Sequence, residues 1–179
     1  MKLPTDYVVF DLETTGLSPA YAEIIEIGAL KVSERIVTGA FHTYVKNTFP
    51  IPEKITRLTG ISDSDTYNAP AVNVALNSFR NFIGSSTLVA HNARFDCSFI
   101  GTASAFCGIN FENPVLDSLE ISRKCLPALK SHRLEALKNY LGIELPSHNA
   151  LDDCKVTYKV IEHCRRLLKS GKEEGKEFE

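Results

Sequence analysis

Apolar and polar positions in the first quarter of the chain follow the pattern of β-strands. Short runs rich in β-branched and aromatic residues predict strands at residues 7–10, 24–32 and 35–45. Only Ser33 and Glu34 separate the second run from the third, which indicates a tight hairpin. A turn is predicted at residues 14–16, directly after the first run and the acids that follow it.

Beyond residue 50 the apolar positions change to a helical spacing. Pro52 stands at the first position of a short predicted helix, residues 53–58, which Gly60 ends. Spacings of three and four predict further helices at residues 71–82, 92–106, 119–124, 132–141 and 150–168, and short apolar runs predict strands at 87–90 and 115–116. Leading strands followed by alternating strands and helices predict an α/β domain with a mixed sheet.

The length and composition are those of one globular domain. The 179 residues are 44% hydrophobic and 23% charged, so we expect a single domain over residues 1–168. The last segment, residues 169–179, contains seven charges and two glycines and is expected to form a flexible tail.

Neither a membrane segment nor a disulfide framework is expected. No apolar run approaches the roughly 20 residues that a membrane helix needs, and early acids interrupt any signal peptide. The five cysteines contain no C-x-x-C pair, which argues against zinc fingers and disulfides. The predicted location is therefore the reducing cytoplasm, with no membrane partner.

Two acids stand two positions apart at the end of the first predicted strand. Side chains at such positions share one face of a strand, so Asp11 and Glu13 lie side by side. Neighbouring carboxylates repel one another and call for a compensating cation, although a turn acid and a surface acid would give the same pattern. Asp96 lies near the apolar side of a predicted helix, where it could equally be a partner of the helix dipole.

A further acid lies on the inward side of the last predicted helix. Asp152 can pair with Lys155 on the polar side, whereas Asp153 begins a stripe that continues with Thr157. His148 lies just ahead of this helix, within about one to two turns of Asp153. Clustered carboxylates suit magnesium or manganese, and two such ions can clamp the oxygens of a phosphodiester. A histidine near them can act as a base at neutral pH.

Three motifs in this chain resemble those of the DEDDh (DnaQ-like) 3′–5′ exonucleases, in the same order and spacing. They are Asp-Leu-Glu-Thr-Thr-Gly-Leu at 11–17, His-Asn-Ala-Arg-Phe-Asp at 91–96, and His148-x-Ala150-x-x-Asp153. The segments 55–61, 116–119 and 134–137 are similar to the bacterial proofreading branch of this family. The resemblance covers residues 6–168 and implies a ribonuclease-H-like fold, a mixed five-stranded sheet flanked by helices.

The resemblance also implies roles for individual residues. Asp11, Glu13 and Asp153 would ligate two divalent cations, Mg²⁺ or Mn²⁺, Asp96 would complete the acidic set through bound water, and His148 would be the general base. The terminal nucleotide would bind Thr14, Thr15, Gly16, Leu17, His91, Asn92 and Phe95, with Leu17 as a wedge against the base.

The activity implied is hydrolysis of DNA from a free 3′ end to 5′-mononucleotides, with single-stranded DNA as the favoured partner. Two alternatives stay open: an exoribonuclease that trims RNA, and a module that binds nucleic acid or a polymerase. Only a short charged tail follows the motifs in this sequence, so we expect either a stand-alone nuclease or a domain that serves a DNA polymerase in trans. The net charge of −2 gives no basic footprint, but residues 123–138 contain five bases and one acid and are expected to contact phosphates.

Overall fold

Five strands form one mixed sheet, as the sequence pattern predicts. The computed structural model describes residues 1–173 of the chain, and its strands are β1 (Tyr7–Thr14), β2 (Ile24–Ser33), β3 (Ile36–Tyr44), β4 (Leu88–Ala90) and β5 (Val115–Asp117). Their order across the sheet is β3-β2-β1-β4-β5. The pairs of β2 with β1 and β3 are antiparallel, and those of β4 with β1 and β5 are parallel.

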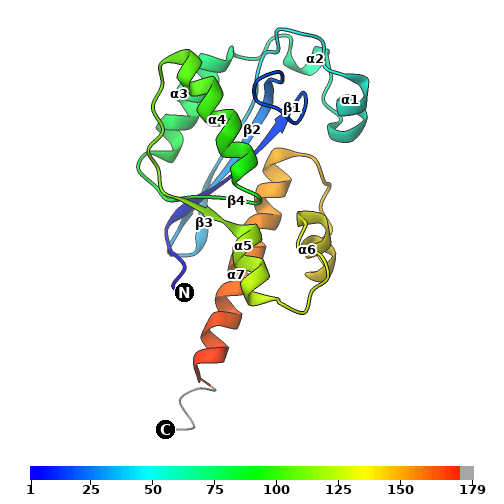
Figure 1. The fold of residues 1–179 in the computed structure, drawn as a ribbon. Coiled ribbons are helices and arrows are strands. Elements are labelled where there is room, and N and C mark those ends of the chain that lie inside the picture. Colours follow the sequence, from blue (N-terminus) through cyan, green and yellow to red (C-terminus); the bar gives the residue numbers. More distant parts are fainter. Residues whose placement is uncertain (174–179) are drawn as a thin grey trace.

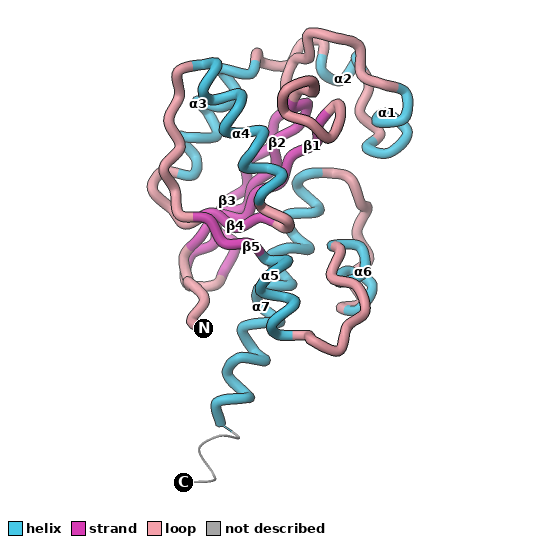
Figure 2. Tube along the Cα trace, viewed as in Figure 1, coloured by secondary structure: helices cyan, strands magenta, loops and turns pink. Residues whose placement is uncertain are grey.

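Helices cover both faces of this sheet (Figure 1). They are α1 (Glu53–Thr59), α2 (Asp63–Thr66), α3 (Val72–Ile83), α4 (Arg94–Cys107), α5 (Ser118–Cys125), α6 (Leu134–Tyr140) and α7 (Ala150–Glu173). Helices α3 and α4 pack on one face, and α5, α6 and α7 on the other. The short helices α1 and α2 lie together near the end of β1, joined by loops (Figure 2).

The ends of some elements differ from the sequence predictions. Helix α2 was not predicted because its four residues are too few for an apolar repeat, and a capping box between Ser62 and Asp65 defines it instead. Helix α7 continues to Glu173, so residues 169–173 of the predicted tail are helical, and residues 174–179 lie outside the described residues. No described helix is long and apolar enough to cross a membrane.

Strand β1 continues through the acids that the sequence placed at its end. Val9 is buried beneath α7, and Asp11 and Glu13 follow it on the same face, because side chains two apart share a face. They pair with Gly28 and Glu26 of β2, and the register shifts only after Glu13. The predicted turn therefore begins after Thr14. The acids are held by the ladder to β2, whereas the pairing with β4 ends at Val9.

Helix α7 begins in direct contact with strand β2. A Cβ atom added to Gly28 would lie 2.5 Å from the carbonyl carbon of Ala150, a distance that no side chain tolerates. One turn further along the helix, the Cys154 thiol donates to the Gly28 carbonyl oxygen over 3.3 Å. A glycine at position 28 is therefore what lets the first turn of α7 reach the acids on β1.

Replacing Gly28 with alanine is expected to unfold the protein more readily, because the helix must move away from the sheet to admit the methyl group. We expect a loss of about 1–3 kcal/mol in the free energy of unfolding, measured by urea denaturation. The control is Gly101→Ala in α4, where an added Cβ meets nothing within 4 Å. That variant should gain up to about 1 kcal/mol from helix propensity, and equal effects of the two substitutions would contradict the packing argument.

Candidate active site

Four carboxylates from three separate elements gather at the carboxyl end of β1. We call Asp11 and Glu13 of β1, Asp96 of α4 and Asp153 of α7 the acid cluster. Asp96 is only 3% exposed, and its Oδ1 accepts from the backbone N–H of Leu12 over 3.2 Å, which fixes it against the strand. Glu13 is 9% exposed, whereas Asp11 and Asp153 are partly open to solvent.

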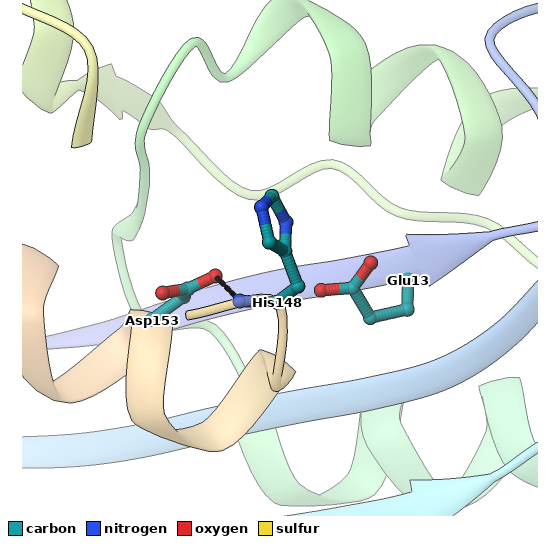
Figure 3. A group of neighbouring side chains, drawn as sticks. All are labelled: Glu13, His148 and Asp153. Carbon is teal, nitrogen blue, oxygen red and sulfur yellow. Dashed lines mark hydrogen bonds between the residues drawn. The ribbon is translucent and has the colours of Figure 1, made fainter. Parts of the chain in front are cut away.

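His148 lies beside two members of the acid cluster. A ring nitrogen of His148 and carboxylate oxygens of Glu13 and Asp153 all lie within 4.8 Å of one another (Figure 3). Its backbone has a left-handed φ of 61°, and its N–H donates to Asp153 Oδ2 over 3.1 Å. The side chain is exposed, so water can reach a ring nitrogen that is held next to the carboxylates.

The carboxylates hold their protons more tightly than free acids do. Burial, and then the charge of Asp153, raises the pKa of Glu13 to about 8. Burial likewise raises the pKa of Asp96 to about 8 and that of Asp153 to about 6. The pKa of Asp11 is well above its usual range, because burial and the charge of Asp96 both oppose ionisation.

Within the described residues, no Lys or Arg forms an ion pair with any of the four acids. Asp152, which is next to Asp153, does form the predicted pair with Lys155, over 2.7 Å, and faces away from the cluster. A cluster of oxygen donors without a basic partner fits a hard divalent cation, and the Glu13–His148–Asp153 group could hold a metal ion.

Sequence reasoning missed Glu26, which positions the start of α7. Glu26 is completely buried, and its carboxylate accepts from the Ala150 N–H over 3.0 Å and from Asn149 Nδ2 over 3.3 Å. His42 Nε2 lies 2.6 Å from the same carboxylate. Asn149 in turn accepts from the Asp152 N–H and caps the helix. The available signal was one acid inside the otherwise apolar run of residues 24–30.

The predicted nucleotide-binding turn at the end of β1 is braced by its own threonines. Thr14 Oγ1 donates to the Gly16 carbonyl oxygen over 2.7 Å, and Thr15 Oγ1 accepts from the Glu23 N–H over 2.8 Å. Leu17 is 88% exposed at the tip of this turn. The turn therefore presents an apolar side chain to solvent from a fixed backbone.

The three predicted binding residues of the second motif have different surroundings. His91 has both ring nitrogens hydrogen-bonded within the protein, to Ser118 and to the His132 carbonyl oxygen. Asn92 is exposed and has a left-handed φ of 64°. The Phe95 ring is half-buried, with its centroid 4.9 Å from that of Phe99. Asn92 and Phe95 can thus contact a ligand, whereas the ring nitrogens of His91 are already hydrogen-bonded within the protein.

The fold and the acid cluster are those of a nuclease domain, and sequence comparison agrees. The sequence model of the exonuclease family RNase_T matches residues 8–161, so the chain belongs to this family. The family and the class of enzyme predicted from the three motifs are confirmed.

Curated relatives are PolC-type DNA polymerase III chains. That of Caldanaerobacter subterraneus subsp. tengcongensis is 42% identical over 161 residues, which is 89% of this chain and 12% of the polymerase. That of Bacillus subtilis is 38% identical over 175 residues, 96% of this chain and 12% of the polymerase. The chain therefore spans about an eighth of the length of these relatives.

Solved structures confirm the fold. E. coli Exonuclease I in complex with a dT13 oligonucleotide superposes with a TM-score of 0.81 and 19% identity, over 93% of this chain and 43% of that one. Exonuclease X in complex with 5′ overhanging duplex DNA gives a TM-score of 0.74 and 20% identity, over 89% and 91% of the two chains. The mixed five-stranded sheet flanked by helices is the predicted ribonuclease-H-like fold.

The raised pKa values predict that metal-free protein becomes less stable as the pH rises. Between about 4.5, the ordinary pKa of a glutamate, and about 8, folded Glu13 keeps a proton that the unfolded chain has lost. The free energy of unfolding therefore falls through this window, by several kcal/mol between about pH 5 and pH 9. Urea denaturation at a series of pH values, with a chelator present, measures this fall.

A glutamine at position 13 cannot ionise, so Glu13→Gln should make the fall in the free energy of unfolding smaller by about 2–4 kcal/mol. Glu144→Gln, which replaces an exposed acid, should leave the fall unchanged. Identical pH profiles for the wild type and Glu13→Gln would contradict the assignment of raised pKa values to the cluster.

Proposed function

We propose that this chain is a metal-dependent 3′–5′ exonuclease that hydrolyses DNA and releases 5′-mononucleotides. The observation that carries the proposal is the acid cluster itself. Four carboxylates are gathered with no basic partner among the described residues, and an exposed histidine stands beside them. Repulsion between buried carboxylates destabilises the folded protein, so a cluster of this kind is typical of a functional site.

Asp11, Glu13, Asp96 and Asp153 would hold two divalent cations, Mg²⁺ or Mn²⁺. Such ions, when bound, supply positive charge to the attacking and leaving oxygens of a phosphodiester. The oxygen-only donor set of the four acids fits this class of cation better than zinc. Asp96 is the most buried of the four, so we assign to it the contact with a cation that passes through a bound water.

His148 would take the proton from the attacking water. Its ring is exposed to solvent, and the backbone hydrogen bond to Asp153 holds it at the edge of the acid cluster. The water oxygen then bonds to phosphorus, and the 3′-oxygen of the preceding nucleotide leaves with the bonding electrons. The products are a 5′-mononucleotide and a strand shortened by one residue.

The 3′-terminal nucleotide would lie on the turn that follows β1. Leu17 projects from this turn as an exposed apolar side chain that can pack against the last base. The backbone around Thr14–Gly16 is braced by two threonine hydroxyls, so it can hold a sugar in a fixed position. Phe95 of the neighbouring helix α4 and Asn92, two residues before that helix, would complete the pocket, and His91 would line it.

DNA is the favoured substrate because the relatives are DNA polymerases and the two solved neighbours are named as DNA complexes. We propose proofreading alongside a polymerase III as the cellular use, with contact to that polymerase as the partner interaction. RNA remains the alternative substrate. Relative rates on matched DNA and RNA oligonucleotides decide between them, and a large preference for RNA would overturn the choice of DNA.

Asp11→Asn should abolish the shortening of a 5′-labelled single strand in Mg²⁺ or Mn²⁺. We expect a loss of at least about 100-fold, above the 10–100-fold typical of mutations around a metal site. Asp152→Asn is the matched control, since this neighbouring acid pairs with Lys155 and stands outside the cluster. Equal activity of the two variants, or no metal-stimulated shortening by the wild type, would contradict the proposed function.

His148→Asn tests the general base, because asparagine also adopts the left-handed backbone found at this position. The rate should fall about 10²–10⁴-fold, the usual contribution of general base catalysis. The affinity for Mn²⁺, measured calorimetrically, should stay unchanged. A parallel loss of Mn²⁺ affinity would instead make His148 a metal ligand, and an unchanged rate would remove its role.

A further inference from the structure

A pocket lined by basic side chains lies on the face of the sheet that α5, α6 and α7 cover. We call it the basic pocket; its volume is about 560 Å³, and Arg123, Lys130 and Arg133 supply its charge. No acidic side chain lines it. Across residues 1–173, none of these three bases forms an ion pair. Three exposed cations without acidic partners make this pocket a site for an anion.

The walls of the basic pocket are fixed by two histidines. His91 lies between Ser118 Oγ and the His132 carbonyl oxygen, 2.8 Å from each. Because a carbonyl only accepts, Nε2 of His91 carries the proton and Nδ1 accepts from the serine. His132 Nε2 in turn donates to the Leu126 carbonyl oxygen over 3.0 Å. The loop that carries two of the three bases is therefore held in one shape before any ligand arrives.

Strand pairing places the basic pocket next to the acid cluster. Strands β1 and β4 are parallel, with Val9 opposite Val89. Asp11 follows Val9 by two residues and His91 follows Val89 by two, so the two lie level at the same end of the sheet. Neighbouring strands are about 4.8 Å apart, so the wall formed by His91 is one strand away from the carboxylates.

We propose that the basic pocket is a subsite for a backbone phosphate of the substrate strand, on the 5′ side of the bond that is cleaved. The inference rests on the proposed exonuclease function and adds where the uncleaved strand is held. Arg123 comes from the last turn of α5 and Arg133 from the residue before α6, so one phosphate can meet bases from two elements. Phosphate contacts of this kind hold a strand without reading its sequence.

Not every base in this segment takes part. Lys138 is buried, and its Nζ donates to the Leu145 carbonyl oxygen over 2.9 Å and contacts Ser147. It therefore braces the segment that leads to His148 rather than facing a ligand. Lys124 is exposed on α5 but does not line the pocket, which makes it a matched control.

The test compares two substrates of different length. One is a 5′-labelled dT12 strand. The other is the p-nitrophenyl ester of thymidine 5′-monophosphate, which keeps the phosphate that is cleaved but has no further phosphate on its 5′ side to fill the subsite. Arg123→Gln and Arg133→Gln should each raise KM for the strand about tenfold, with little change in kcat. Each should also lower the slope of log kcat/KM against log salt by about 0.7. Hydrolysis of the ester should stay within twofold of the wild-type rate.

The outcomes separate this inference from the proposed function. If the wild type cleaves both substrates and the two variants keep its KM and salt slope on the strand, the basic pocket is not a phosphate subsite, although the exonuclease proposal stands. If Lys124→Gln raises KM as much as the pocket variants do, overall charge explains the effect and the subsite is overturned. If the wild type cleaves neither substrate, the proposed function itself has failed.

Discussion

The first turn of α7 rests directly on strand β2, and the arrangement of the active site depends on that contact. Gly28 leaves room for the backbone at Ala150, and the buried carboxylate of Glu26 accepts from the N–H of the same residue. The residues just before and after this point are His148 and Asp153. The close approach therefore delivers an acid from the first turn of α7, and a base from the loop just before it, to a strand that already carries two carboxylates.

This arrangement joins stability to function through electrostatics. The packed contact between α7 and the sheet, together with the hydrogen bond that holds Asp96 of α4 to Leu12, brings acids from three elements together, and none of them forms an ion pair with a described Lys or Arg. The folded protein can lower the repulsion between these acids either by keeping protons on them or by binding cations. The burial that raises the pKa values is at the site that we propose for divalent ions, and the basic pocket that we propose for the strand lies beside it. Opposite charges are thus separated across one face of the sheet.

Periodicity predicted most of the fold, because nearly every strand and helix buries one side. It failed where polar residues interrupt the period: β1 runs on through Asp11 and Glu13, since pairing with β2 holds them in the ladder. The motifs predicted the acids of the site. The role of Glu26 was not predictable, because its partners at the start of α7 are more than 120 residues away. The charge count of the basic segment likewise gave no means of telling buried Lys138 from the bases that line the pocket.

Calorimetric titration of the metal-free protein with Mn²⁺, in buffers of different ionisation enthalpy, tests the central claim most directly. At pH 7 the carboxylates of Glu13 and Asp96, with pKa values of about 8, still hold protons that a cation must displace. We predict that binding of about two ions releases about one to two protons per protein. Binding without proton release, or no binding at millimolar Mn²⁺, would contradict the assignment of these acids to a metal site.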